Sequence, residues 1–258
     1  MLFETLLFER RGRIAQVTLN RPDRLNALDA TLIRELTAAA GLIGADPDVR
    51  AVLLGANGRA FCSGADLMRA PTASLEASLR DQFNPMVSAW YHLPVPVIVA
   101  VQGIAAGAGM SLALAGDIVI AARSATFLQL FAPKLGLMPD LGSSFHLPRM
   151  VGTARAKGLA LLGDALSAAD AAAWGLIWAC VDDQDLVTTS ATIAQRLSDG
   201  PTRAYRQIKE VFNEQPPRTL EEQLERELRG QTALGDTRDF AEGLSAFRGK
   251  RAPSFTGE

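Results

Sequence analysis

The stretch PVIVAVQGIAAGAGMSLALAGDIVIAA, Pro96 to Ala122, decides the fold of this chain. It opens with an apolar run that ends at Val101 and closes with a second apolar run that follows Asp117. Between the two runs lie a glycine-rich segment, expected to form a turn, and a short apolar segment, expected to form a helix. Strand, helix and strand in this order are typical of a parallel β–α crossover, and near-continuous apolar strands fit a sheet covered on both faces. The stretch therefore predicts an α/β core.

The same region has one feature of a membrane span, because residues 82–116 contain no Asp, Glu, Lys or Arg. A spanning helix needs about 20 continuous apolar residues. Here Pro94, Pro96 and four glycines divide the apolar residues into short pieces. We therefore expect buried strands and a buried helix, and no membrane association.

Upstream of this stretch the pattern also alternates between strand and helix. Two apolar runs around RRG, residues 5–10 and 13–20, predict a hairpin. Apolar residues at helical spacing predict a helix from Ala30 to Ile43, with Asp29 as its N-cap. A strand followed by a turn is expected at AVLLGANG, and a further helix within residues 75–91.

Downstream, the pattern changes after about Met150. SAADAAAWG predicts a helix capped by Ser167, and LIWACVDD predicts a last strand. The remaining pattern is helical, over residues 184–197, 201–212 and a segment that starts after Thr219.

The order of these elements predicts two parts. Residues 1–195 are expected to form the α/β core, and residues 196–258 a helical C-terminal region.

Composition excludes several classes of protein. The 258 residues include 48% apolar and 21% charged residues, with a net charge of −2. This balance fits an ordinary globular protein and lacks the basic face that nucleic-acid binding normally requires. The two cysteines, Cys62 and Cys180, have neither zinc-site nor disulfide spacing, which favours a reducing cytoplasm. The N-terminus lacks the basic-then-apolar order of a signal peptide.

Two loops of small residues are the first candidates for chemistry. AFCSGADL (60–67) and GIAAGAGMSLALAGD (103–117) each follow an expected strand and lead toward a helix. Backbone N–H groups at a helix start carry partial positive charge, so two such loops side by side can offer two donors to one oxygen, an oxyanion hole. The alternative is that glycine and alanine only permit tight packing. A dinucleotide fingerprint is not supported, because Leu112 stands where its third glycine is required.

A single carboxylate, Asp140, stands within LGLMPDLG (135–142) among apolar side chains and glycines. It is either an ordinary loop aspartate or the acid/base group of an active site. Ser143 and His146 follow closely, but a Ser–His–Asp triad rarely fits within one turn.

In this order, the segments VTLNRPDRLNALD, AFCSGADL, the opening stretch, LGLMPDLGSSFHLPRMVG and EGLSAFRGKRAPSFTG resemble the crotonase family, also called the enoyl-CoA hydratase/isomerase superfamily. The resemblance covers nearly the whole chain. It implies a spiral of stacked ββα turns with a C-terminal helical region that mediates trimerisation, and trimers that commonly pair into hexamers. It also implies an acyl-CoA substrate, in which coenzyme A is part of the substrate and no separate cofactor is needed.

The resemblance assigns roles to individual residues. It places the thioester carbonyl between the backbone N–H groups of Ala65 and Ala108. Relatives often have glycine at the second position, where the alanine methyl narrows the pocket. Residues expected beside the CoA nucleotide are Arg24, Asn26, Ala27, Ser63, Asp66 and Leu67. Phe247 and Lys250 match positions that reach the CoA of a neighbouring subunit.

The expected chemistry follows from which carboxylates are present. Hydratases of this family use two glutamates to add water. Here the first position is Ser111, and the second falls at Ala132 or Pro133, in a segment that carries one extra residue. Neither serine nor alanine is an ionised base at neutral pH, so efficient hydration is not expected. Asp140 matches the carboxylate of members that shift double bonds and of aryl-CoA dehalogenases, and an apolar pocket should raise its pKa.

Within the family, the chain is most similar to the isomerases of bacterial phenylacetate degradation, which convert ring-1,2-epoxyphenylacetyl-CoA into oxepin-CoA. The resemblance therefore implies an acyl-CoA isomerase. Two alternatives stay open: a Δ3,Δ2-enoyl-CoA isomerase of fatty-acid oxidation, and a chain labelled enoyl-CoA hydratase with weak or no hydratase activity. A catalytically weak partner subunit and a dinucleotide-binding oxidoreductase are readings from other classes.

Overall fold

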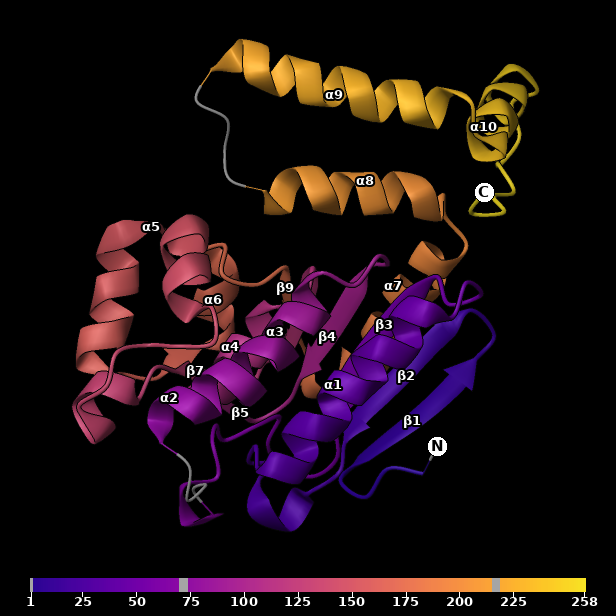
Figure 1. The fold of residues 1–258 in the computed structure, drawn as a ribbon. Helices are drawn as coiled ribbons and strands as arrows, with labels where there is room; N and C mark the ends of the chain where they lie inside the picture. The colour runs from indigo at the N-terminus through magenta and orange to yellow at the C-terminus, as the bar shows by residue number, and fades with distance from the viewer. Residues whose placement is uncertain (1, 70–73, 215–218) are drawn as a thin grey trace.

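A computed structural model, which describes residues 2–69, 74–214 and 219–258, shows two β-sheets with helices packed around them (Figure 1). The large sheet has the strand order β1-β2-β3-β4-β6-β9. Its strands are β1 (Leu6–Arg11), β2 (Ile14–Leu19), β3 (Ala51–Ala56), β4 (Val97–Val101), β6 (Ile118–Ala122) and β9 (Ala179–Val181). Only the β1–β2 hairpin is antiparallel, and the other pairs in this sheet are parallel.

The small sheet is formed by β5 (Ile104–Ala106), β7 (Thr126–Leu128) and β8 (Leu166–Ser167). A strand of the large sheet, a strand of the small sheet and a helix follow each other twice, as β4-β5-α4 and as β6-β7-α5. An isolated bridge between Cys62 and Ala105 pairs the segment after β3 with β5, so this earlier part of the chain continues the same pattern. The predicted spiral of ββα turns is confirmed.

The segment between β4 and β6 differs from prediction in two respects. The glycine-rich part was expected to be a turn, yet it contains β5, and α4 (Ala108–Leu114) already starts within this part, ahead of the apolar run that begins at Met110. Gly103 makes the abrupt reversal after β4 possible. Its φ is +58°, and a Cβ there would lie 2.0 Å from Arg59 O.

Several helices form as their sequences predict. In α1 (Ala30–Ala45), the Asp29 side chain accepts a hydrogen bond from Leu32 N. The helix expected within residues 75–91 is continuous but contains a π-helical turn, so that it divides into α2 (Leu75–Ser78), η3 (Leu79–Phe83) and α3 (Asn84–Tyr91). Ser167 caps α6 (Ala168–Ala173). The long helix α5 (Ser143–Leu162) was not predicted, and it is interrupted at Gly152 (φ 77°, ψ 157°).

The C-terminal helices form an arm beyond the core (Figure 1). The helix α7 (Leu186–Ser198) packs against β2, β3, β4 and β6. Beyond it, α8 (Thr202–Asn213), α9 (Leu220–Gly235) and α10 (Arg238–Arg248) extend away from the sheets. The division at residues 195 and 196 stays a prediction. Among the described helices, none combines the length and apolar character that a membrane span requires.

A partly buried ion pair fastens α8 to the core, with 10% of the Lys209 side chain and 22% of the Asp117 side chain exposed. Lys209 Nζ lies 2.6 Å from Asp117 Oδ2 and donates to Val95 O at 2.8 Å. Asp117 Oδ2 also accepts from Val97 N at 2.7 Å, at the start of β4. Burial raises the pKa of Asp117 and lowers that of Lys209, and each partner opposes the shift of the other. Desolvation thus disfavours both charges, and each depends on its partner.

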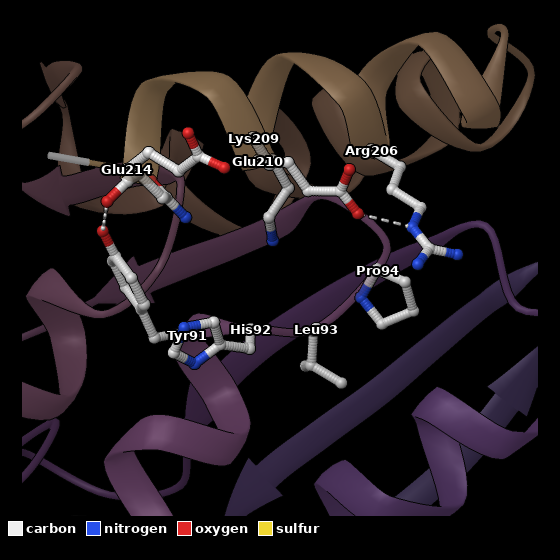
Figure 2. Close-up of a pocket in the computed structure, with 9 residues that line it drawn as sticks. Tyr91, His92, Leu93, Pro94, Arg206, Lys209, Glu210 and Glu214 are labelled. Atoms are coloured by element: carbon white, nitrogen blue, oxygen red, sulfur yellow. Dashed lines mark hydrogen bonds and ion pairs between the residues drawn. The ribbon is translucent and has the colours of Figure 1, made fainter. Parts of the chain in front are cut away.

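A cavity of about 370 Å³ lies between the end of α3 and α8, and Figure 2 shows Lys209 reaching from α8 across it. Tyr91 closes one side, where its hydroxyl donates to Asn213 O at 3.1 Å. Separate polar contacts at Lys209 and at Asn213 therefore hold α8 to the core, and the cavity lies beside them.

We expect Lys209→Met to lower the free energy of unfolding by about 2 kcal/mol, because the partly desolvated Asp117 carboxylate loses its cation and its charged hydrogen bond. The matched control is Arg229→Met, which breaks the exposed Arg229–Glu225 pair of α9 (3.0 Å) and should cost about 0.5 kcal/mol or less. Urea unfolding at neutral pH measures both. Equal losses would contradict the role assigned to Lys209.

Candidate active site

Two backbone loops meet at the start of α4. The loop of residues 60–67 pairs with β5 through Cys62, whose N–H donates to Ile104 O at 3.1 Å, while Ala106 N donates to Cys62 O at 2.9 Å. Small residues make this contact possible, since a Cβ on Gly109 would lie 2.3 Å from Cys62 O. The same small residues therefore fit both interpretations of these loops, tight packing and the binding of an oxyanion.

The backbone N–H groups of Ala65 and Ala108 belong to these two loops. Ala108 is the first residue of α4, after Gly107 at φ 50° and ψ −121°, a conformation that suits glycine. Among the described residues, neither N–H has an acceptor. A methyl group added to Gly64 would lie 3.0 Å from Ala106 O and 3.6 Å from Ala108 N, so the absence of a side chain there lets the loops approach closely. Two free donors on adjacent loops can hold one anionic oxygen.

Asp140 lies between η4 (Phe131–Leu135) and α5, and its backbone is fixed to α4. Its carbonyl accepts from Ser143 N at 2.9 Å and from Ser111 Oγ at 3.2 Å. Its Oδ1 is buried and has no hydrogen-bond partner in the described part of the chain. Burial raises the pKa of Asp140 to about 6, and a hydrogen bond from its own N–H opposes this shift. Such a carboxyl group is suited to proton transfer near neutral pH.

The residues after Asp140 do not form a triad with it. Ser143 Oγ accepts from Gln129 Nε2 at 3.0 Å. His146 packs edge-on against the rings of Tyr91 and Phe145, and burial lowers its pKa to about 4. His146 is therefore neutral over the range in which Asp140 titrates.

The two glutamate positions of the hydratases carry no carboxylate. Ser111 is buried in α4, and Ala132 and Pro133 both lie in η4, which is a π-helical turn. Among the described residues, no group of three or more His, Cys, Asp and Glu side chains could hold a metal ion.

Two of the residues expected beside CoA are engaged within the protein. Asn26 is fully buried, and its amide donates to Asn57 O and Ala60 O, both at 2.9 Å. Asp66 pairs with Arg21 at 3.1 Å, with only 9% of either side chain exposed. These side chains fix the loop of residues 21–27 against the loop that carries Ala65.

The other expected CoA residues differ in exposure. Arg24 ends the exposed turn η1 (Pro22–Arg24), and Leu67 starts η2 (Leu67–Arg69) with 59% of its surface exposed. Ala27 is buried, and Ser63 is half-buried, with its N–H bonded to Leu25 O at 3.0 Å. Arg24 and Leu67 are thus the accessible members of this set.

Phe247 and Lys250 are not brought to this site within the chain. Phe247 lies in α10 with 84% of its surface exposed, and Lys250 is exposed just after that helix. In Figure 1, α10 ends the C-terminal arm, while α2, which follows the Ala65 loop, lies at the opposite edge of the molecule.

Arg21 is a residue that the sequence analysis missed. Its guanidinium lies 2.9 Å from Asp29 and 3.1 Å from Asp66, and it also donates to Ala27 O. A lone arginine before a proline gives no sign of burial. In the sequence, the only signal for a role of Arg21 was its place within VTLNRPDRLNALD, one of the segments that resemble the family.

Comparisons with known proteins identify the family of the chain. The profile of the enoyl-CoA hydratase/isomerase family matches residues 9–258. A Rhodobacter capsulatus protein named "Probable enoyl-CoA hydratase" is 46% identical, and the 1,2-epoxyphenylacetyl-CoA isomerase of Escherichia coli is 44% identical, each over the full length of both chains. The crystal structure of an enoyl-CoA hydratase from Bacillus anthracis superposes with a TM-score of 0.92 at 31% identity, over 99% of this chain and 100% of that one.

Proposed function

The chain belongs to the enoyl-CoA hydratase/isomerase family, and on this premise we propose that it isomerises an acyl-CoA thioester by proton transfer through Asp140. One observation carries the proposal: a carboxyl group with a buried, unpartnered oxygen stands beside α4, while both hydratase glutamate positions lack a carboxylate. The 44% identity to the Escherichia coli isomerase supports the same reaction class and favours ring-1,2-epoxyphenylacetyl-CoA as the substrate.

The proposed mechanism uses two backbone donors and one carboxylate. The Ala65 and Ala108 N–H groups hold the thioester oxygen as negative charge develops on it, which stabilises an enolate. The Asp140 carboxylate takes a proton from one carbon of the acyl chain and returns it to another. Substrate and product contain the same atoms and electrons, so the reaction consumes neither water nor redox equivalents.

The experiment offers the purified chain three thioesters: ring-1,2-epoxyphenylacetyl-CoA, 3-hexenoyl-CoA and crotonyl-CoA. Isomerisation changes the NMR spectrum of a product but not its mass, whereas hydration adds the mass of water. We expect rearrangement of at least one of the first two substrates and no rapid hydration of crotonyl-CoA. Preference between the first two separates the phenylacetate-type isomerase from a Δ3,Δ2-enoyl-CoA isomerase. Rapid hydration would refute the proposal.

The pH dependence of the reaction is set by Asp140. Because the carboxylate form accepts the proton, kcat/KM should be constant well above pH 6 and fall tenfold per pH unit well below it, with an apparent pKa of about 6. A pH–rate profile with either isomerisation substrate measures this. A limb near the ordinary aspartate pKa would mean that Asp140 is solvated or is not the base.

We also propose that the chain forms a homotrimer, or a hexamer of two trimers, in which Phe247 and Lys250 reach the CoA bound to a neighbouring subunit. Large apolar side chains exposed along α8, α9 and α10 support this assembly: Ile208, Phe212, Leu220, Leu224, Leu228, Phe240, Leu244 and Phe247. Such an exposed apolar surface is typical of an interface. Light scattering should give three or six times the chain mass, and a monomer would contradict the assembly.

The remaining parts of the proposal concern setting and partners. We place the protein in the cytoplasm, where its two free cysteines would stay reduced, and in phenylacetate degradation. CoA enters as part of the substrate, and we propose neither a separate cofactor nor a nucleic-acid partner.

A further inference from the structure

Three buried polar side chains are joined by hydrogen bonds to one another and, through Ser111, to the backbone of Asp140, and they have no role in the mechanism above. Ser111 lies in α4, Ser143 begins α5, and Gln129 follows β7. At most 1% of the surface of each residue is exposed. Three separate parts of the chain thus bring polar groups together beside the backbone carbonyl of Asp140.

We propose that Gln129, Ser143 and Ser111, here called the Ser–Gln cluster, are positioning residues that fix the backbone of Asp140 and thereby aim its carboxyl group at the acyl chain. This inference rests on the proposed function, in which Asp140 transfers the proton.

The hydrogen bonds of the Ser–Gln cluster run in one direction. Gln129 Nε2 donates to Ser143 Oγ at 3.0 Å, which leaves the Ser143 hydroxyl proton free to donate to Ser111 Oγ at 2.6 Å. The Ser111 hydroxyl proton then has two acceptors, Asp140 O and Gly107 O, both at 3.2 Å. The chain of donors therefore ends on the Asp140 carbonyl and on the residue before the Ala108 donor, so one cluster joins both halves of the site.

The backbone that the cluster holds adopts an unfavourable conformation. Leu141 has φ +49° and Gly142 has φ +83°, so two consecutive residues are left-handed. For a residue with a Cβ, such as Leu141, this conformation is uncommon and persists where neighbouring contacts impose it. Without the bonds to the Asp140 carbonyl, we expect the turn to relax and its carboxyl group to move toward water.

A role in packing alone would not explain why an amide side chain stands at position 129. Its Oε1 is buried without a hydrogen-bond partner among the described residues, which is unfavourable. An apolar side chain would fill the same space without burying that oxygen. The amide is explained if its donor is needed to orient Ser143.

The test measures isomerisation by Ser111→Ala, Ser143→Ala and the double variant. The matched control is Ser190→Ala, which removes an equally buried helical serine of α7 that donates to Leu186 O at 2.7 Å. We expect each cluster variant to lower kcat by about 10- to 100-fold, the effect of a displaced catalytic group. KM should change by no more than about twofold, because these side chains do not contact CoA in the proposal. Ser190→Ala should leave both constants unchanged.

Two further readouts separate positioning from general structural damage. In the cluster variants, the acid limb of the pH–rate profile should move below pH 6, because a carboxyl group that gains water loses the effect of burial on its pKa. The nearby His146 ring is neutral in this range, and burial raises the pKa of the Tyr91 hydroxyl beside it, so neither ring changes charge there. The double variant should be about as slow as the slower single variant, since groups acting as one unit are not additive.

If Ser143→Ala does not fold, Gln129→Met takes the place of that variant in the test. Gln129→Met removes the donor to Ser143 and keeps a similar side-chain length. An unchanged kcat, an unchanged acid limb, or single effects that multiply in the double variant would overturn the role of the Ser–Gln cluster. Failure of the proposed function is distinguishable, because it would appear as full activity of Asp140→Asn.

Discussion

Asp140→Asn is expected to lower kcat for isomerisation by about 10²- to 10⁴-fold, the usual contribution of a general acid/base. Asparagine keeps the size of the side chain but cannot accept and return the proton. The thioester contacts of Ala65 and Ala108 come from the backbone and are unaffected, so affinity for acyl-CoA should stay within about threefold of wild type. Single-turnover kinetics and calorimetric titration with a substrate thioester measure the two quantities.

The matched control for this variant is Asp164→Asn, which makes the same change at an exposed position after α5. It should leave both turnover and binding unchanged. Substantial turnover by Asp140→Asn would remove Asp140 from the mechanism. Loss of binding together with turnover would instead assign Asp140 to substrate affinity.

Ala108→Pro is expected to lower kcat by about 10²- to 10³-fold, the effect of deleting one oxyanion donor. Ala108 is the first residue of α4, and this is the helical position at which proline is best tolerated, because its missing N–H makes no intrahelical bond. The substitution therefore removes the proposed donor, and the ring Cδ takes the place of the amide hydrogen that would hold the oxygen. The same turnover assay, combined with thermal unfolding, measures the effect.

Ala108→Gly is the control, because it keeps the N–H and removes only the methyl group. It should retain turnover and, by widening the pocket, accept bulkier acyl groups. If Ala108→Pro isomerises as fast as Ala108→Gly, the N–H of residue 108 does not hold the thioester oxygen.

The sequence predicted those elements for which the local residue pattern and the tertiary environment favour the same structure. The opening stretch is apolar enough to require burial, and the cap at Asp29 is a local contact that a short pattern can specify. The strand β5 was missed because its three residues are set by pairing with distant β7 and not by their own pattern. The helix α5 was missed because it contains Pro148 and Gly152, which ordinarily end a helix.

The candidate site divides in the same way. The apolar neighbours of Asp140 along the chain predicted a raised pKa, and the structure confirms this direction. The paired donors at Ala65 and Ala108 came from family resemblance, because small residues alone also fit plain packing. Arg21 and Gln129 were not predicted, since their importance arises from burial by segments far away in the sequence.

The contact between Cys62 and the start of α4 has a practical consequence for labelling the protein. Burial raises the pKa of the Cys62 thiol to about 12, so alkylating reagents meet almost no thiolate there at neutral pH. Cys180, in β9, is partly accessible. A maleimide fluorophore should therefore attach at a single position in the unaltered chain, and fluorescence could follow assembly without mutagenesis.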